Sequence, residues 1–127
     1  MEAIPVMAGQ TITIRTTDSN EVNLIDILLA VKPFISVFEW EINVECSLAP
    51  SGRVLEGAKG LPRSTAELLE MSSRPYLQVI EGKLIGRSPT DTLIISAVDG
   101  QWWDIETASK EIQRSLLLAF PTATSRT

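Results

Sequence analysis

The chain has 127 residues, a length typical of one domain, and its acidic residues outnumber its basic residues by 16 to 11. It contains no histidine and one cysteine. The missing histidine removes the commonest general base and metal ligand, and a single cysteine excludes an internal disulfide and a thiolate zinc site. The net charge of −5 disfavours nucleic-acid binding, which needs lysine and arginine to neutralise phosphates. We therefore expect no enzyme, no catalytic residue, no cofactor and no metal.

The first third of the chain predicts a strand, a helix and a second strand. Threonine alternates with isoleucine in Gln10–Thr16, apolar residues recur at helical spacing in Glu21–Val31, and apolar residues alternate with acids in Phe34–Cys46. Ser19 or Asn20 would cap the helix, and Pro33 would end it. The alternation assigns one face of the second strand to the core, namely Phe38, Trp40, Ile42, Val44 and a buried Cys46.

The middle of the chain predicts a long surface loop followed by a short helix. Ala49–Arg63 contains two prolines and three glycines, and its glycine-rich part lacks the Gly-Lys-Ser/Thr order of a phosphate-binding loop. Ser64 and Glu67 then form a capping box, which opens a helix that turns Leu68, Leu69 and Met71 inward.

Two hairpins are predicted in the second half of the chain. Their turns are Glu81-Gly82, between strands Tyr76–Ile80 and Lys83–Arg87, and Asp99-Gly100, between strands Thr92–Val98 and Gln101–Glu106. A two-residue turn at Asp99-Gly100 pairs Val98 with Gln101. This register places four residues on the core face, namely Ile94, Val98, Trp103 and Ile105.

Together these elements predict an α+β fold with a twisted, mainly antiparallel sheet of about six strands and three helices packed mostly on one face. Residues 1–120 would form a single domain, ending in a helix over Ala108–Ala119 that Thr107 caps, and residues 121–127 would be a disordered tail. Residues 1–9 lack the basic start of a signal peptide, and the longest apolar stretch, Ile25–Val31, is too short to cross a membrane. We therefore expect a cytoplasmic protein that does not associate with membranes.

Three glutamates predict an acidic stripe on the second strand. Glu39 and Glu41 are two residues apart, so their side chains share a face, and Glu45 continues the alternation. The stripe is either a solvated surface that aids solubility or a face that binds a protein. Catalysis or metal binding would need a cleft that pushes the carboxylate pKa values apart, and nothing in the sequence indicates one.

Two adjacent tryptophans mark the last predicted strand. Because neighbouring strand residues point to opposite faces, Trp103 joins the core, while Trp102 shares the other face with Asp104 and Glu106. Either a helix or loop covers Trp102, or the three residues form a partner-binding patch with an aromatic anchor and an acidic rim.

Residues 75–120 read PYLQVIEGKLIG, then TLIISAVDGQWWDIET, and then a predicted helix. This order resembles small bacterial immunity proteins of polymorphic and contact-dependent toxin systems, in which a hairpin of the form apolar-Asp-small-x-aromatic-Trp-acid-apolar precedes a polar residue that caps the last helix. The matching residues are Val98, Asp99, Gly100, Trp102, Trp103, Asp104, Ile105, Glu106 and Thr107.

The resemblance implies a small, cytoplasmic, non-catalytic protein that binds and neutralises a cognate toxin with a basic surface, and many such toxins are nucleases. Partner-binding residues would be Trp102, Asp104, Glu106, Glu39, Glu41 and Glu45. A secretion chaperone or small adaptor is the alternative, because such proteins are also acidic and α+β. Chaperones of this kind dimerise, whereas the immunity interpretation favours a monomer. The run Leu116–Leu118 would serve a dimer, or one of its leucines packs under a loop.

Overall fold

The computed structural model describes residues 10–17, 21–48, 55–58, 60–74 and 77–126. Its strands are β1 (Gln10–Arg15), β2 (Glu39–Leu48), β3 (Arg63–Ser64), β4 (Gln78–Arg87), β5 (Thr92–Val98), β6 (Trp102–Thr107) and β7 (Thr124–Arg126). Its α-helices are α1 (Leu24–Val31), α2 (Thr65–Ser72) and α3 (Lys110–Ala119), and two short 3-10 helices are η2 (Lys32–Phe34) and η3 (Glu56–Ala58).

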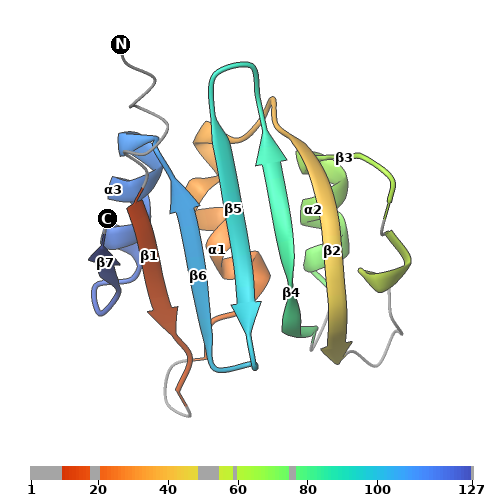
Figure 1. The fold of residues 1–127 in the computed structure, drawn as a ribbon, viewed down its shortest axis with the longest axis horizontal. Helices are drawn as coiled ribbons and strands as arrows, with labels where there is room; N and C mark the ends of the chain where they lie inside the picture. The colour runs from red at the N-terminus through yellow and green to blue at the C-terminus, as the bar shows by residue number, and fades with distance from the viewer. Residues whose placement is uncertain (1–9, 18–20, 49–54, 59, 75–76, 127) are drawn as a thin grey trace.

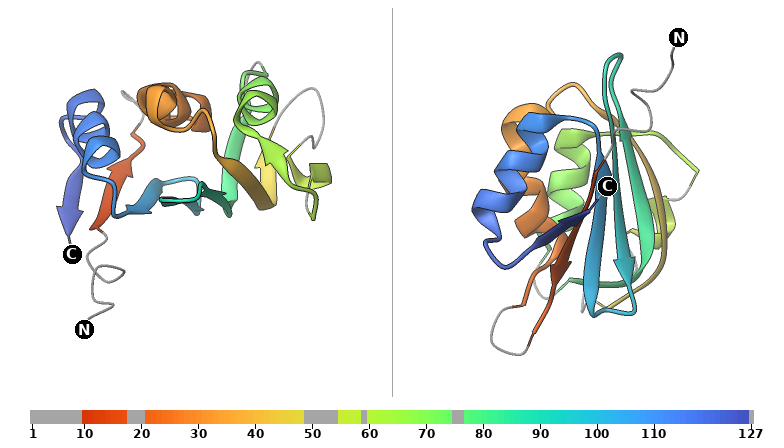
Figure 2. Two further views of the ribbon diagram at one scale, coloured as in Figure 1. Left: turned by 90° about the horizontal axis from the view of Figure 1, so that it is seen from above. Right: turned by 60° about the vertical axis from the view of Figure 1, so that its left-hand side comes forward.

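All the strands form one antiparallel sheet in the order β3-β2-β4-β5-β6-β1-β7 (Figure 1). The three α-helices lie side by side on one face of that sheet (Figure 2). The predicted α+β class and the one-sided helix layer are therefore confirmed, with seven strands in place of about six. Both edge strands are short, with two residues in β3 and three in β7, and short edges discourage edge-to-edge pairing with other chains.

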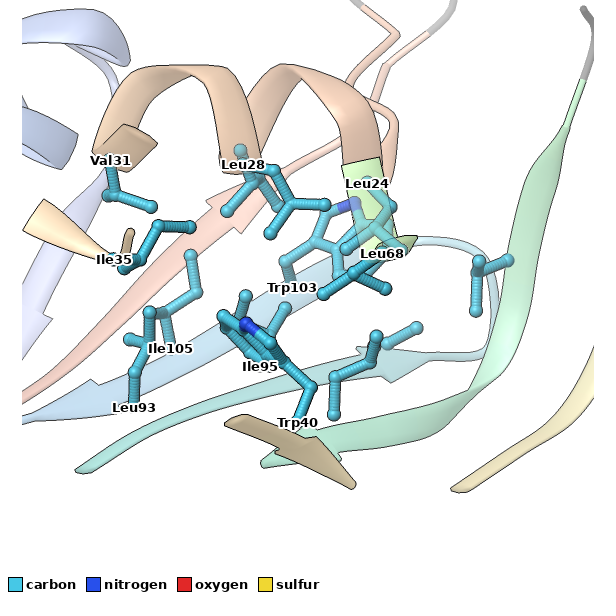
Figure 3. Packing of buried hydrophobic residues seen from close by; sticks show 14 of the residues in the cluster. Leu24, Leu28, Val31, Ile35, Trp40, Leu68, Leu93, Ile95, Trp103 and Ile105 are labelled. Atoms are coloured by element: carbon cyan, nitrogen blue, oxygen red, sulfur yellow. The ribbon is translucent and has the colours of Figure 1, made fainter. Parts of the chain in front are cut away.

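The core lies between the sheet and the helices (Figure 3). Two tryptophans fill its centre, and each has a partner for its indole N–H. Trp40 Nε1 donates to Thr65 Oγ1 at 2.9 Å, and Trp103 Nε1 donates to the Val22 carbonyl at 3.0 Å. Because a buried indole N–H without an acceptor is costly, these bonds fix where α2 and the segment before α1 pack on the sheet.

The capping residues of the helices agree in part with those predicted from the sequence. Ser64 caps α2 as predicted, since its hydroxyl accepts the Glu67 amide at 3.1 Å. Helix α3 begins at Lys110, two residues later than predicted, and Ser109 rather than Thr107 caps it. Helix α1 starts at Leu24, where the Asp26 carboxylate accepts the Asn23 amide at 2.8 Å. The caps predicted for it, at 19–20, lie outside the described residues.

The hairpin predicted at Glu81-Gly82 is wrong, because both residues lie inside the continuous strand β4. A β-carbon on Gly82 would lie 2.7 Å from the Val44 Cα, so this glycine serves a close approach of β2 and β4 rather than a turn. The pairing register of the two strands shifts on either side of Cys46. As a result Cys46 is exposed, and the prediction that it is buried is wrong.

The predicted register of the β5–β6 hairpin is off by one residue. Asp99 and Gly100 have positive φ values of 53° and 66°, and the Gln101 amide closes the turn on the Val98 carbonyl at 2.9 Å. Gln101 then stays outside the ladder, so that Val98 pairs with Trp102. A one-residue slip moves side chains to the other face, so Ile94 and Val98 leave the core and Leu93, Ile95 and Ala97 enter it.

The ends of two predicted elements also differ. Strand β2 begins at Glu39 rather than Phe34, because η2 and a turn follow α1 directly. The tail predicted to be disordered instead contains β7, which pairs Thr11 with Arg126 and Thr13 with Thr124. No local pattern signals such a pairing, because β7 meets the first strand of the chain rather than a neighbour in sequence.

Gly86→Ala should lower the free energy of unfolding by about 1–3 kcal/mol, because the added carbon would lie 2.8 Å from two ring atoms of Trp40. Urea denaturation measures the change. Gly57→Ala is the matched control, since its added carbon meets nothing within 4 Å. Equal stability of the two variants would contradict tight packing of the Trp40 ring on the sheet.

Candidate protein-binding face

The candidate site is the face of the sheet opposite the three helices, called here the open face (Figure 2). The pairing registers arrange its side chains in rows across the strands. One row runs Glu41, Ile85, Ile94, Glu106, Thr11, Arg126, the next runs Asn43, Lys83, Ser96, Asp104, Thr13, Thr124, and a third contains Val98, Trp102 and Arg15. The open face thus draws on strands from both ends of the chain.

The structure brings the two predicted groups of site residues onto this one face. Glu39 and Glu41 lie on β2, while Trp102, Asp104 and Glu106 lie on β6. Strands β4 and β5 separate β2 from β6, which corresponds to about 14 Å at three strand spacings. Glu45 does not extend the stripe by register, because it stands at the irregularity between Val44 and Cys46.

The half-buried apolar side chains of the open face form two pairs, called here the apolar centre, and the polar row that begins at Asn43 runs between them. Ile85 on β4 pairs with Ile94 on β5, and Val98 pairs with Trp102 on β6. The outer face of an antiparallel sheet is normally polar along each strand. Of the two predicted environments of Trp102, cover by an α-helix is wrong, since the three α-helices that the structure describes lie on the other face of the sheet (Figure 2).

Trp102, Asp104 and Thr13 form a hydrogen-bonded group that we call the Trp102 cluster. Trp102 Nε1 donates to Asp104 Oδ2 at 3.2 Å, and Thr13 Oγ1 donates to Asp104 Oδ1 at 2.7 Å. Arg126 Nη1 donates to Thr13 Oγ1 at 2.9 Å. The Arg15 guanidinium carbon lies 5.4 Å from the centre of the Trp102 ring, a cation–π distance.

Glu41 anchors a second polar group at the β2 end of the face. Asn43 Nδ2 donates to one carboxylate oxygen of Glu41 at 2.9 Å, and Arg87 Nη1 lies 3.4 Å from the other. The hydrogen bond from Asn43 and then that from Arg87 hold the pKa of the Glu41 carboxyl below its ordinary value. In register Glu39 faces Arg87, so the predicted acidic stripe is partly neutralised.

The open face is therefore of mixed charge rather than uniformly acidic. Its basic residues are Arg15, Lys83, Arg87 and Arg126, and its acidic residues on regular rows are Glu39, Glu41, Asp104 and Glu106. Glu106 is exposed and stands beside Ile94. An apolar centre with a charged rim is the usual layout of a surface that binds a protein.

The sequence does not predict the residues that surround Trp102 and Asp104, which are Thr13, Arg15 and Arg126. Alternation in β1 does place Thr13 and Arg15 on the face opposite Ile12 and Ile14. Nothing local indicates that this face meets Trp102, because β1 pairs with β6 across most of the chain. Arg126 was assigned to a disordered tail, and the aliphatic residues Ile85 and Ile94 were not considered as surface.

Within the residues that the structure describes, no three acidic or cysteine side chains converge as metal ligands. None of the described helices is long and apolar enough to span a bilayer. No protein-family model, no curated protein and no solved structure matches this chain.

The Glu41 carboxyl should titrate below the ordinary glutamate range when followed by NMR. Because the folded pKa is lowered, Glu41 stabilises the fold above its unfolded pKa and loses this effect as pH falls through the folded pKa. Asn43→Ala and Arg87→Ala should each raise the pKa of Glu41, since both side chains donate a hydrogen bond to its carboxylate. An unchanged Glu41 pKa in Asn43→Ala would contradict the geometry at this end of the face.

Proposed function

We propose that this chain is a non-catalytic immunity protein that binds and neutralises a cognate bacterial toxin in the cytoplasm through its open face. The observation that carries the proposal is that two half-buried apolar pairs, Ile85 with Ile94 and Val98 with Trp102, lie on the outer side of adjacent strands, one on each side of a polar row. Apolar patches with polar rims on otherwise soluble surfaces mark sites of protein association. The resemblance of residues 75–120 to immunity proteins supplies the class of partner.

Trp102 is the anchor of the proposed interface. Tryptophan and arginine are enriched among the residues that dominate binding energy, and here Arg15 stacks on the Trp102 ring. The hydrogen bond to Asp104 already satisfies the indole N–H, so a partner can cover the ring without stranding a polar group.

Charge supports a basic partner, for which Glu106 and Glu39 offer exposed carboxylates on the open face. The net charge of −5 would speed the approach of a positively charged toxin, and such steering weakens as salt rises. A nuclease has a positive substrate cleft, so a toxin of that kind fits this surface. Neutralisation then follows from occupying the cleft or the region beside it.

Trp102→Ala should weaken toxin binding by about thirtyfold, the effect of truncating an interface tryptophan that contributes about 2 kcal/mol. The melting temperature should change little, because Trp102 lies outside the core. The toxin for this test is chosen among the products of neighbouring genes as one that arrests growth when expressed alone. The affinity of each variant for this toxin and the rescue of growth by each variant are both measured. Leu118→Ala is the control, since Leu118 is 76% exposed on the helix side.

Two results would contradict the proposal. The first is that Trp102→Ala binds the toxin as tightly as the unmodified protein while Leu118→Ala does not, which would move the interface to the helix side. The second is that the protein fails to rescue growth from every toxic product of a neighbouring gene. Either result removes the open face from toxin neutralisation.

A secretion chaperone or adaptor is the second candidate, and exposed leucines favour it. Helices α1 and α3 expose Leu29 by 54%, Leu117 by 38% and Leu118 by 76%. A chaperone would use such residues to dimerise, whereas the immunity proposal predicts a monomer. Light scattering should therefore give the mass of one chain. A tight dimer that Leu118→Asp dissociates would favour the chaperone.

A further inference from the structure

We propose that the Trp102 cluster is a guanidinium-binding site, which accepts an arginine side chain of the protein partner and which the chain's own Arg15 and Arg126 occupy in the free protein. The identity of the partner rests on the proposed function. The chemistry of the site rests on the contacts that these two arginines already make.

The cluster combines the three groups that recognise a guanidinium, which are an aromatic face, a carboxylate and a hydroxyl acceptor. The Trp102 ring supplies the aromatic face, and Arg15 lies over it at 5.4 Å. Asp104 supplies the carboxylate, and its two hydrogen bonds to Trp102 and Thr13 hold it in a single orientation. The site is thus organised before a partner arrives.

Thr13 links Asp104 to Arg126 through two hydrogen bonds of its hydroxyl group. The Thr13 hydroxyl donates to Asp104 at 2.7 Å and accepts from Arg126 at 2.9 Å. A hydroxyl that donates to a carboxylate becomes a stronger acceptor, because hydrogen bonds in a chain polarise one another. A carboxylate has about four acceptor positions, and the two bonds to Asp104 leave room for further donors.

The chain's own arginines bind only weakly in the site. Both Arg15 and Arg126 are exposed, and all three residues of β7, the strand that carries Arg126, are exposed as well. The cation–π contact of Arg15 and the hydrogen bond of Arg126 contribute little at exposed positions, because water competes for both guanidinium groups. An arginine on a large partner surface, delivered together with burial of the apolar centre, can therefore replace either of them.

The site should select arginine over lysine. The planar guanidinium can stack on the indole and donate in the plane at the same time, whereas an ammonium offers only a point charge. Glu106 adds a second carboxylate on the same face of β6, two residues beyond Asp104, and it is exposed. These groups match a partner surface that presents arginine near aliphatic side chains.

The first experiment titrates the free protein with N-acetyl-arginine amide while NMR follows the indole N–H signals. The Trp102 signal should shift, while those of Trp40 and Trp103 stay in place because both are buried on the other face. N-acetyl-lysine amide, which carries the same charge, should shift Trp102 less. Equal shifts with the two amides would overturn a guanidinium site.

The second experiment removes an internal occupant. Arg126→Ala should tighten the apparent binding of N-acetyl-arginine amide by about two- to fivefold, because the site no longer has to be vacated. Arg114→Ala removes an exposed arginine from α3 and should change nothing. Asp104→Asn keeps the shape of the side chain and should weaken binding. Unchanged or weaker binding in Arg126→Ala would overturn the proposal.

These titrations need no toxin, so they fail separately from the proposed function. Arginine-selective binding together with full toxin neutralisation by Trp102→Ala would retain the site and reject the open face as the immunity surface. Loss of neutralisation in Trp102→Ala together with no preference for arginine would do the reverse.

Discussion

The register of the β5–β6 hairpin decides which side chains meet the helices and which lie on the open face. Gln101 adds one residue beyond the Asp99-Gly100 turn, and its carbonyl accepts the Thr16 amide at 2.9 Å. That bond extends the pairing of β1 with β6 by one residue beyond Arg15 and Trp102. Because strand faces alternate, Trp103 and Ile105 then point toward α1, and Trp102 and Asp104 point away from every described helix. With a two-residue turn, the faces of β6 and β1 would be unchanged, but Ile94 and Val98 of β5 would face the helices in place of Leu93, Ile95 and Ala97.

Local patterns were enough to predict the fold class. Alternation identified β1 and β2, and the capping box at Ser64 identified the start of α2. Local patterns give wrong predictions where tertiary contacts override the local preference of a residue. Gly82 looks like a turn residue, yet its missing side chain lets β2 approach β4. Cys46 continues an apolar alternation, yet the register shift around it turns the strand and Ser47 is buried in its place.

The sequence predicts only part of the candidate site, and the reason is physical. Trp102, Asp104 and Glu106 share a face by their spacing alone, and the structure confirms that they do. Their neighbours come from β1 and β7, which lie near opposite ends of the described chain, so no window of sequence contains them together. The same pairing adds Arg15 and Arg126 to a surface that the sequence predicts to be acidic. The strand order therefore determines the charge of the open face, which cannot be read from the net charge of the chain.

The distance along the chain between the two halves of the Trp102 cluster has a consequence for folding. Thr13 and Asp104 are 91 residues apart, whereas short connections join β4, β5 and β6. Contacts between distant residues form late, because the entropy of closing a long loop must be overcome first. The meander of β4, β5 and β6 is thus expected to assemble before β1 docks on its edge. A partly folded chain would display Trp102 without Thr13 or either arginine, so the complete surface is itself a marker of the native state.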